Sequence, residues 1–296
     1  TNLSSGPRVL NGLRATLSHE QSERNLLPTR WLAVAQFIDT RDSNAYMYGA
    51  YSIHNQMRKF GMLEAGIEHV LIIADELSEG MQNLTDAIVG RNNIVRVDRM
   101  AIRSLVQKGM WPHVFSKLEA FNLTQYNKVI VLDNDIFIRQ SIAHWFDYPA
   151  PAAVTAGASE VEWNSGAMLI DEPSAHTYQL LLDYIPRSGP FDSREIPSED
   201  NWNSGMGQQG FLSSFYTSNV TNDTIFTMPY HSCMLHSAIK ANLYYLHFRL
   251  NIFETIHFTT AKPWSSKTNT SEKFTCLFLG EWWDSVLGIA DLLGAD

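Results

Sequence analysis

The chain has 296 residues, 45% of them hydrophobic and 18% charged, and a formal net charge of −9 at pH 7. This composition is typical of a globular protein with a large core. The negative charge argues against nucleic acid as a partner, because phosphate contacts need clustered Lys and Arg. No apolar run approaches the ~18 residues that a membrane span requires. The sequence begins at Thr1 rather than Met, which leaves room for an upstream signal or membrane anchor outside the printed sequence.

Strands and helices alternate along the first part of the chain. Residues 32–38, 69–74 and 94–97 are apolar runs typical of strands, and residues 45–60 have the pattern of a helix that stops at Gly61. Strands that alternate with helices usually pair in parallel through right-handed connections. The first part of the chain therefore predicts a parallel sheet.

The later part of the chain is less regular. Ser116 and Glu119 match a capping box and predict the start of a short helix. Further strands are predicted at 128–132, 152–155, 165–170 and within 244–258, and further helices at 173–185, 210–216 and 281–293. We therefore predict an α/β fold with a central mixed, mostly parallel sheet flanked by helices. Residues 1–28 are expected to form a polar lead-in segment, and residues 29–296 a single domain.

The strand at 128–132 runs into Asp133-Asn134-Asp135, and a second apolar run follows at 136–138. Such a β-branched run is typical of a strand buried on both faces, where unpaired carboxylates are too costly to bury. On an extended backbone, side chains at i and i+2 project the same way, so Asp133 and Asp135 can bind one hard cation. The alternative is a turn with two solvated aspartates. The position at the carboxyl end of a strand, where α/β sheets bind ligands, favours the metal site.

Three other groups are candidates for the same edge of the sheet. His257 ends an apolar run and is the best remote metal ligand, although it could be an ordinary half-buried histidine; two aspartates and a histidine suit Mn²⁺ or Mg²⁺ better than Zn²⁺. Asn164, directly before the strand at 165–170, can hydrogen-bond sugar hydroxyls or simply form a turn. Gln208 and Gln209 precede a predicted helix whose first N–H groups attract anions, or they are two exposed glutamines.

Two features bear on the compartment. Six N-x-[ST] sequons occur where composition alone would give roughly 2–3. They begin at Asn2, Asn83, Asn122, Asn219, Asn222 and Asn269. Cys233 and Cys276 form an even pair that is either one disulfide or two buried thiols. We expect the lumen of the secretory pathway, and the Golgi within it in view of the chemistry below, with the cytoplasm as the alternative.

Four stretches, in this order, resemble glycosyltransferase family 8, the glycogenin-like retaining enzymes of the GT-A type. They are FSKLEAFNLTQYNKVIVLDNDIFIRQSIAHWFD at 115–147, WNSGAM at 163–168, QGFL at 209–212 and HFTTAKPW at 257–264. The resembling region covers nearly the whole body of the chain. A D-x-D motif alone is a weak signal, whereas four motifs in family order at suitable spacing are a strong one.

The resemblance implies a GT-A fold and transfer of a sugar from a UDP-sugar donor to a hydroxyl of a glycan or glycoprotein acceptor, with retention at the anomeric carbon. Mn²⁺, or else Mg²⁺, would be held by Asp133, Asp135 and His257. The donor-binding positions that carry over are Tyr46, Ser43, Lys117, Asn134, Asn164, Ser165, Gln209 and Lys262. Gln208 and Gln209 would lie at the catalytic centre. A homodimer is also compatible with the sequence.

Two departures from the family pattern concern the sugar end of this site. The family usually has an Asp where Gln208 stands, so a neutral amide replaces a carboxylate that would bond sugar hydroxyls or stabilise positive charge. Either the sugar specificity differs, or Asp200 takes over, or activity is reduced. The closing motif also lacks a Gly whose N–H approaches a phosphate, so Thr259 or Thr260 would have to supply that contact.

The sequence therefore predicts a metal-dependent glycosyltransferase, with two alternatives. The first is a catalytically weak or inactive member that binds UDP or a glycan, for which Gln208 is the reason. The second is a phosphatase-type D-x-D hydrolase, which would want Thr or Val where Phe137 stands. The stretch 156–162, with Glu160 and Glu162, aligns poorly with the family, and the sugar and the acceptor are not determined.

Overall fold

A computed structural model describes residues 31–38, 45–74, 76–97, 112–155, 163–185, 208–218, 220–221, 223–235, 252–259, 262–264 and 273–293. The chain divides into two compact units, residues 1–31 and 32–296, and the fold below is that of the second unit. The lead-in segment expected at residues 1–28 lies outside the described residues, so it stays a prediction.

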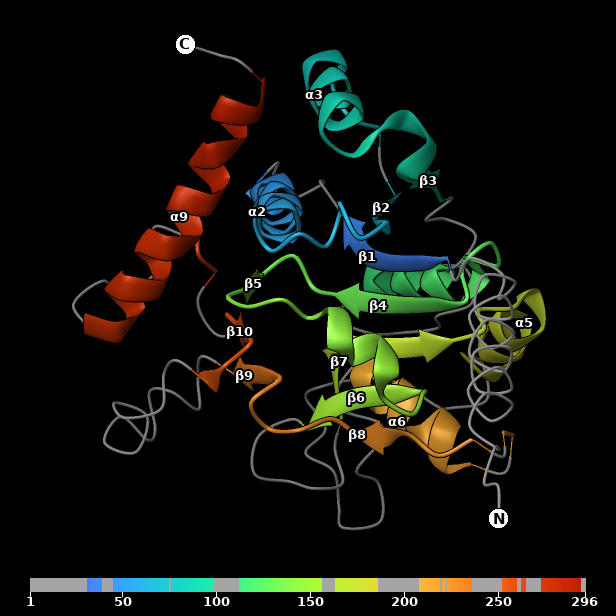
Figure 1. The fold of residues 1–296 in the computed structure, drawn as a ribbon. Helices are drawn as coiled ribbons and strands as arrows, with labels where there is room; N and C mark the ends of the chain where they lie inside the picture. Colours follow the sequence, from blue (N-terminus) through green and yellow to red (C-terminus); the bar gives the residue numbers. More distant parts are fainter. Residues whose placement is uncertain are drawn as a thin grey trace, which may run out of the picture. The chain divides into compact units, whose positions relative to one another are not determined.

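A seven-stranded sheet forms the centre of this unit, in the order β3-β2-β1-β4-β7-β6-β8 (Figure 1). The strands are β1 (Leu32–Ile38), β2 (Ile67–Ile73), β3 (Ile94–Arg96), β4 (Lys128–Leu132), β6 (Ala152–Thr155), β7 (Trp163–Asp171) and β8 (Phe226–Thr227). The four strands from β3 to β4 are parallel, whereas β7 is antiparallel to both β4 and β6. The prediction of an α/β fold around a mixed, mostly parallel sheet is confirmed.

Helices cover both faces of this sheet, because each central strand is apolar on both sides. Ile130 and Val131 are neighbours in β4 and therefore point to opposite faces. Ile130 packs with Ile53 of a helix on one face, and Val131 with Phe215 of a helix on the other. The helices are α2 (Ala45–Lys59), α3 (Glu79–Val89), α5 (Ala175–Tyr184), α6 (Gln208–Thr217) and α9 (Lys273–Leu293), with 3₁₀ helices η1 (Arg91–Asn93), η2 (Pro112–Asn122) and η3 (Ala143–Asp147).

A second, three-stranded sheet lies beside the first, between it and α9 (Figure 1). It has the order β5-β10-β9, from β5 (Ile136–Ile138), β10 (Thr255–His257) and β9 (Cys233–Leu235). Phe137 of this sheet, Phe258 and Trp282 of α9 share one buried cluster. The apolar run after the D-x-D motif thus belongs to a different sheet from the run before it.

Several predicted elements need correction or extension. The helix expected from Ser116 is the 3₁₀ helix η2, which begins at Pro112; the Ser116 hydroxyl is buried and has no hydrogen-bond partner in the part of the chain that the structure describes, so it caps nothing there. Helix α9 begins at Lys273 rather than near residue 281. Helix α3 and strands β8 and β9 were not predicted.

The structure bears on two expectations from the sequence, the possible disulfide and the absence of a membrane span. Cys233 is a free and fully enclosed thiol, so the disulfide alternative is wrong for it; the side chain of Cys276 lies outside the described part. Burial raises the pKa of Cys233 to about 12, so the thiol is protonated. Among the described residues, no helix has both the length and the apolar character that a membrane span needs.

Candidate active site

The D-x-D residues form the turn by which the chain passes from the large sheet to the small one. Strand β4 ends at Leu132, and the N–H of Asp133 still donates to the carbonyl of Gly166 in β7 (2.8 Å). The N–H of Ile136 donates back to the carbonyl of Asp133 (3.1 Å), and β5 begins there. Because the turn lies at the carboxyl end of β4, both carboxylates lie at the edge where α/β sheets bind ligands.

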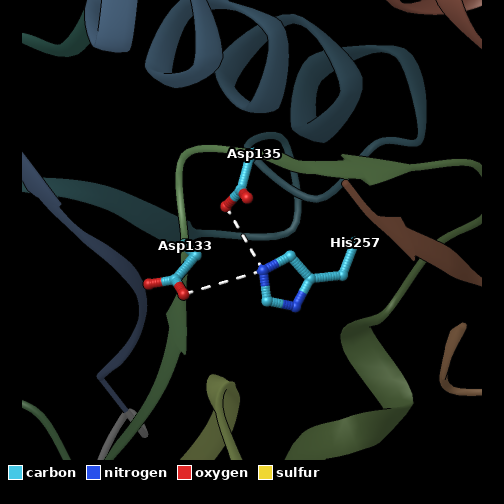
Figure 2. Close-up of side chains that lie close together, drawn as sticks. All are labelled: Asp133, Asp135 and His257. Carbon is cyan, nitrogen blue, oxygen red and sulfur yellow. Dashed lines mark ion pairs between the residues drawn. The ribbon is translucent and has the colours of Figure 1, made fainter. Parts of the chain in front are cut away.

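Strand pairing in the small sheet brings His257 to this turn. β10 runs antiparallel to β5 with His257 opposite Ile136, and the N–H of Phe258 donates to the carbonyl of Asp135 (2.9 Å). His257 Nε2 lies 3.3 Å from Asp135 Oδ1 and 3.8 Å from Asp133 Oδ2 (Figure 2). A histidine more than 120 positions along the chain therefore faces both aspartates.

Each carboxylate also has one lysine partner. Lys117 of η2 donates to Asp133 Oδ1, and Lys262 donates to Asp135 Oδ2. In the first pair the lysine is the buried member, with 8% of its side chain exposed against 29% for Asp133. In the second pair the aspartate is buried at 6%, and the Lys262 side chain is 35% exposed.

The charges of the second pair follow from these contacts. Burial raises the pKa of Asp135, but His257 and Lys262 outweigh it and hold that pKa well below its ordinary value. Burial lowers the pKa of Lys262, but the Asp135 carboxylate outweighs it and raises that pKa on balance. Both groups are therefore charged at neutral pH, so Asp135 offers an anionic carboxylate to any bound cation.

Gly166 lies directly against Asp133 and His257. A Cβ placed on Gly166 would lie 2.4 Å from His257 Cε1, 2.9 Å from Asp133 Oδ2 and 2.7 Å from Asn164 Oδ1. These separations are shorter than non-bonded contacts allow, so only glycine fits beside His257 and Asp133. Asn164 Oδ1 accepts from the Gly166 N–H (2.7 Å), which fixes the backbone at this close approach.

The donor atoms suit a hard divalent cation. One atom from each of Asp133, Asp135 and His257 lies within 4.8 Å of the others, so the three form a candidate metal site. Two carboxylates and one imidazole, with no thiolate, favour Mn²⁺ or Mg²⁺ over softer ions. The imidazole presents Nε2 to the carboxylates, and its Nδ1 is buried with no hydrogen-bond partner among the described residues.

The other predicted donor residues lie around this group to different degrees. Tyr46, at the start of α2, lies edge-on to Trp264 with ring centroids 5.1 Å apart, and its electrostatic effect on Lys262 shows that it is close to that lysine. The peptide of Ser165, buried next to Asn164, accepts from Lys117 Nζ (3.3 Å). Tyr46 thus lies near the lysine that pairs with Asp135, and Ser165 contacts the lysine that pairs with Asp133.

Other predicted residues are described less fully. Gln209 is half-buried in the first turn of α6, and no contact places it against the metal group. Ser43, Asp200, Thr260, Glu160 and Glu162, and the side chain of Gln208, lie outside the described part of the chain. Their predicted roles stay predictions.

Sequence reasoning missed the support behind the D-x-D turn. The Asn134 side chain points away from the ligands and accepts from Gln36 Nε2 of β1 (2.9 Å). The other end of the same amide, Gln36 Oε1, lies 2.8 Å from Nε2 of His69 in β2. The signal was present: a Gln within the apolar run 32–38 and a His at the start of 69–74 need hydrogen-bond partners if those strands are buried.

Comparison with known proteins decides the family. The pattern of the family described as Glycosyl transferase family 8 matches residues 45–209, which is more than half of the chain. The chain belongs to glycosyltransferase family 8. The predicted resemblance is therefore confirmed, and the chain is a glycosyltransferase by family.

Relatives within and around this family are distant in sequence. The chain is 22% identical to mouse glycogenin-1 over 270 residues, which cover 84% of the chain and 74% of that protein. It is 24% identical over 258 residues to the putative UDP-glucuronate:xylan alpha-glucuronosyltransferase 5 of Arabidopsis thaliana, covering 87% of the chain and 39% of that protein. The chain thus spans well under half of the plant relative's length.

Solved structures confirm the fold. The galactosyltransferase LgtC, solved in complex with donor and acceptor sugar analogues, matches with a TM-score of 0.57 at 13% identity, covering 87% of this chain and 96% of that one. At this identity the match shows the GT-A fold alone.

Proposed function

We propose that the protein is a metal-dependent retaining glycosyltransferase that moves a sugar from a UDP-sugar to a hydroxyl of a glycan or glycoprotein. The observation that carries the proposal is the convergence of Asp133, Asp135 and His257 within 4.8 Å at the carboxyl edge of the sheet, in a chain of family 8. A phosphatase-type hydrolase has no such support, because the family match covers the D-x-D turn.

The three ligands would hold Mn²⁺, with Mg²⁺ as the second choice for an oxygen-rich set. A divalent cation there supplies charge stabilisation to the diphosphate as it leaves. Lys262, half-exposed beside Asp135, would turn its ammonium toward the same phosphates. Lys117, which is buried, would keep Asp133 aimed at the metal while its other contact, the Ser165 carbonyl, borders the sugar side.

The remaining donor contacts divide between the nucleotide and the sugar. Tyr46 would stack on the uracil ring with Ser43 nearby, and the backbone at Asn134 would meet the ribose. Asn164 and Ser165 would line the sugar pocket. Both are more than nine-tenths buried at the start of β7, which supports a fixed rather than a mobile pocket wall.

In the transfer step the bond between the anomeric carbon and the β-phosphate oxygen breaks, and a bond from the acceptor oxygen to that carbon forms. The acceptor proton passes to the departing phosphate oxygen, so no strong protein base is needed if attack occurs from the leaving-group side. Gln209, with Gln208 before it, would lie beside the anomeric carbon, and its amide would orient the reacting groups.

Calorimetric titration with UDP tests the nucleotide and metal part of this proposal. We expect UDP to bind in the presence of Mn²⁺ and to bind much more weakly without it. A luminescent UDP-release screen over UDP-glucose, UDP-galactose, UDP-xylose, UDP-glucuronate and the UDP-N-acetylhexosamines then identifies the donor. Asp133→Ala should abolish UDP release, whereas Asp171→Ala, which removes an exposed carboxylate at the opposite end of β7, should leave it unchanged. The absence of UDP binding with Mn²⁺ present would overturn the proposal.

Gln208 favours a second candidate, a catalytically weak or inactive member that binds UDP or glycan. The variant Gln208→Asp restores the family carboxylate. If the amide limits turnover, this variant should raise UDP release by about tenfold or more without changing UDP affinity, because added charge stabilisation acts in the transition state. Unchanged turnover in an active protein would show that the family carboxylate is not needed here.

We further propose that the protein acts in the secretory lumen, in the Golgi, rather than in the cytoplasm. Of the sequons on described residues, Asn83 is exposed on α3, and Asn122 is partly exposed at the end of η2, where its amide donates to Glu119 (2.8 Å). Expression in a secretory host should give a mass that falls after peptide:N-glycosidase treatment. Size-exclusion chromatography of the same product tests the expected homodimer, and fractionation of the full-length protein tests an upstream anchor.

A further inference from the structure

A chain of buried polar side chains runs from α2 through the parallel sheet to the middle of the D-x-D turn. His54 of α2 and His69 of β2 meet through their Nδ1 atoms (3.2 Å), and His69 Nε2 meets Oε1 of Gln36 in β1 (2.8 Å). Gln36 Nε2 donates to Asn134 Oδ1 (2.9 Å), and Asn134 Nδ2 donates to the Phe37 carbonyl (2.7 Å). None of the four polar residues is more than 7% exposed.

The direction of every hydrogen bond follows from the last one. The Phe37 carbonyl can only accept, so the Asn134 amide must present its oxygen to Gln36. Gln36 then donates with Nε2 and must accept from His69 with Oε1. His69 therefore carries its proton on Nε2 and accepts at Nδ1, which requires a proton on His54 Nδ1.

This arrangement requires His69 to be neutral, because protonated Nδ1 would face the N–H of His54. Burial lowers the pKa of His69 well below its ordinary value, and His54 adds to this effect. Burial, with a contribution from Arg58, lowers the pKa of His54 to about 4. At neutral pH both rings are uncharged, and every hydrogen bond in this series of side chains is donated in the same direction, from His54 towards the Phe37 carbonyl.

The turn is held from its other side by backbone. A Cβ on Gly49 of α2 would lie 1.9 Å from the Asn134 carbonyl oxygen and 2.7 Å from its carbonyl carbon. The helix therefore touches the peptide that joins the two metal ligands. Asn134 is fixed by its side chain on the sheet side and by its peptide on the helix side.

We propose that Gln36 and His69 are positioning residues of the metal site, with His54 selecting the His69 tautomer. Asn134 lies between Asp133 and Asp135 in the turn, so any rotation of its peptide re-aims both carboxylates. By holding the Asn134 amide, the buried chain keeps both carboxylates directed at one cation. This inference rests on the proposed metal function, which it extends to residues that touch neither metal nor substrate.

The energetics of buried hydrogen bonds argue against a purely structural role for these side chains. Replacing both partners of a buried hydrogen bond by apolar groups of similar shape is often nearly neutral for stability. A relay of four polar side chains, two of them in otherwise largely apolar strands, is therefore not required for folding. Residues that orient metal ligands, by contrast, typically change metal affinity by about 10–100-fold when they are replaced.

The test measures Mn²⁺ affinity by the electron paramagnetic resonance signal of free Mn²⁺, with thermal unfolding measured in parallel. Gln36→Met removes the bond to Asn134, and His69→Leu removes the support behind Gln36; each should weaken Mn²⁺ binding by about tenfold or more. His69→Gln keeps a donor at the Nε2 position and should bind Mn²⁺ within about threefold of the wild type. Ser52→Ala removes a buried hydroxyl of α2 that bonds Ser285 (3.0 Å) and should lower the unfolding temperature without changing Mn²⁺ affinity.

The outcomes separate this inference from the proposed function. If the wild type binds Mn²⁺ and both disruptive variants bind it equally well, the positioning role is wrong. If His69→Gln weakens binding as much as His69→Leu, the hydrogen-bond chain is not what matters, and the inference also fails. If the wild type does not bind Mn²⁺, the metal function fails; crystal structures of wild type and Gln36→Met then decide positioning, which stands only if the Asp133 and Asp135 carboxylates move apart in the variant.

Discussion

The two halves of the metal group are built in opposite ways. On the side of the large sheet, a partly exposed Asp133 pairs with a buried Lys117. On the side of the small sheet, a buried Asp135 pairs with a half-exposed Lys262 and faces the buried His257. Both pairs join a carboxylate to an ammonium. The buried member is the lysine on the side of the large sheet and the aspartate on the side of the small sheet.

The two halves therefore differ in which side chains can change rotamer. A buried side chain that is enclosed by its neighbours cannot change rotamer cheaply, whereas a half-exposed one can. Asp135 and His257 form the rigid part of the site, and Lys262 is the side chain that can change rotamer. On the other side the lysine is rigid, and Asp133 is the ligand that can adjust.

Asp135→Asn should have the largest effect, because it changes the rigid half. The substitution removes the negative charge that faces both His257 and Lys262, and one carboxylate oxygen becomes an NH₂ that can neither accept from Lys262 nor bind a cation. We expect Mn²⁺ affinity to fall by about 100-fold or more and the free energy of unfolding to fall by about 2–4 kcal/mol, as measured by Mn²⁺ titration and urea denaturation.

Asp133→Asn is the matched variant on the adjustable half. It retains an acceptor for Lys117 but removes the charge that compensates this buried ammonium, so stability should fall by about 1–2 kcal/mol, less than in Asp135→Asn, while Mn²⁺ affinity still falls by about tenfold or more. Equal losses of stability in the two variants would show that the two halves are not built differently.

Gly166→Ala should disturb both halves at once. Its Cβ would come within 2.4 Å of His257 and 2.9 Å of Asp133, so one ligand must move. We expect Mn²⁺ affinity to fall by about tenfold and stability by about 1–3 kcal/mol, the usual effect of overpacking. Gly280→Ala, at an exposed position in α9 with open space around it, should instead stabilise by up to about 1 kcal/mol and leave Mn²⁺ affinity unchanged.

The two halves also differ in how far the sequence predicts them. Asp133 follows a strand whose apolar pattern is strong, and the alternation of strands and helices places it at the carboxyl edge. Asp135 and His257 meet only because β5 leaves the large sheet and pairs with β10, and strands of three residues carry almost no periodicity. The residue pattern offered His257 as a candidate ligand, with an ordinary half-buried histidine as the alternative, and the family resemblance favoured the metal role.

Buried polar residues escaped prediction for a different reason. Gln36 and His69 lie in strands that read as apolar, and sequence gives the need for a partner but not the partner itself. Gln36 and His69 meet diagonally across β1 and β2, where the register pairs Gln36 with Leu71 and His69 with Val34. Asn134 reaches Gln36 from the D-x-D turn, and only the folded sheet determines these contacts. Likewise, nothing in the tripeptide Asn164-Ser165-Gly166 indicates that Gly166 lies against Asp133 and His257.

The buried histidines should give stability a pH dependence that the metal group does not share. The pKa of His54 is about 4 in the folded protein, and that of His69 is also lowered, against an ordinary value of 6.5. Between these values the unfolded chain binds more protons, so stability should fall as pH drops from about 6.5 towards 4, by roughly 1.4 kcal/mol per pH unit for each histidine.

Urea denaturation at several pH values measures this slope. His54→Asn keeps a donor at the Nδ1 position but cannot take up a proton, so it should reduce the slope by the equivalent of about one proton. A slope that is unchanged in this variant would mean that His54 is already charged in the folded protein, contrary to the hydrogen-bond directions assigned to the buried side chains.

Lys262→Gln should have the smallest effect, and it tests which half is mobile. If Lys262 leaves Asp135 to meet the diphosphate, its loss should weaken UDP binding in Mn²⁺ by about fivefold, close to 1 kcal/mol. Stability should change little, because a glutamine amide can still donate to Asp135 and the Lys262 side chain is already 35% exposed. Lys117→Gln should show the reverse, a larger loss of stability than of UDP affinity, because Lys117 is enclosed beside Asp133. If Lys262→Gln instead lowers the unfolding temperature and leaves UDP affinity intact, Lys262 is fixed to Asp135, and the mobile cation must be sought on the other side of the site.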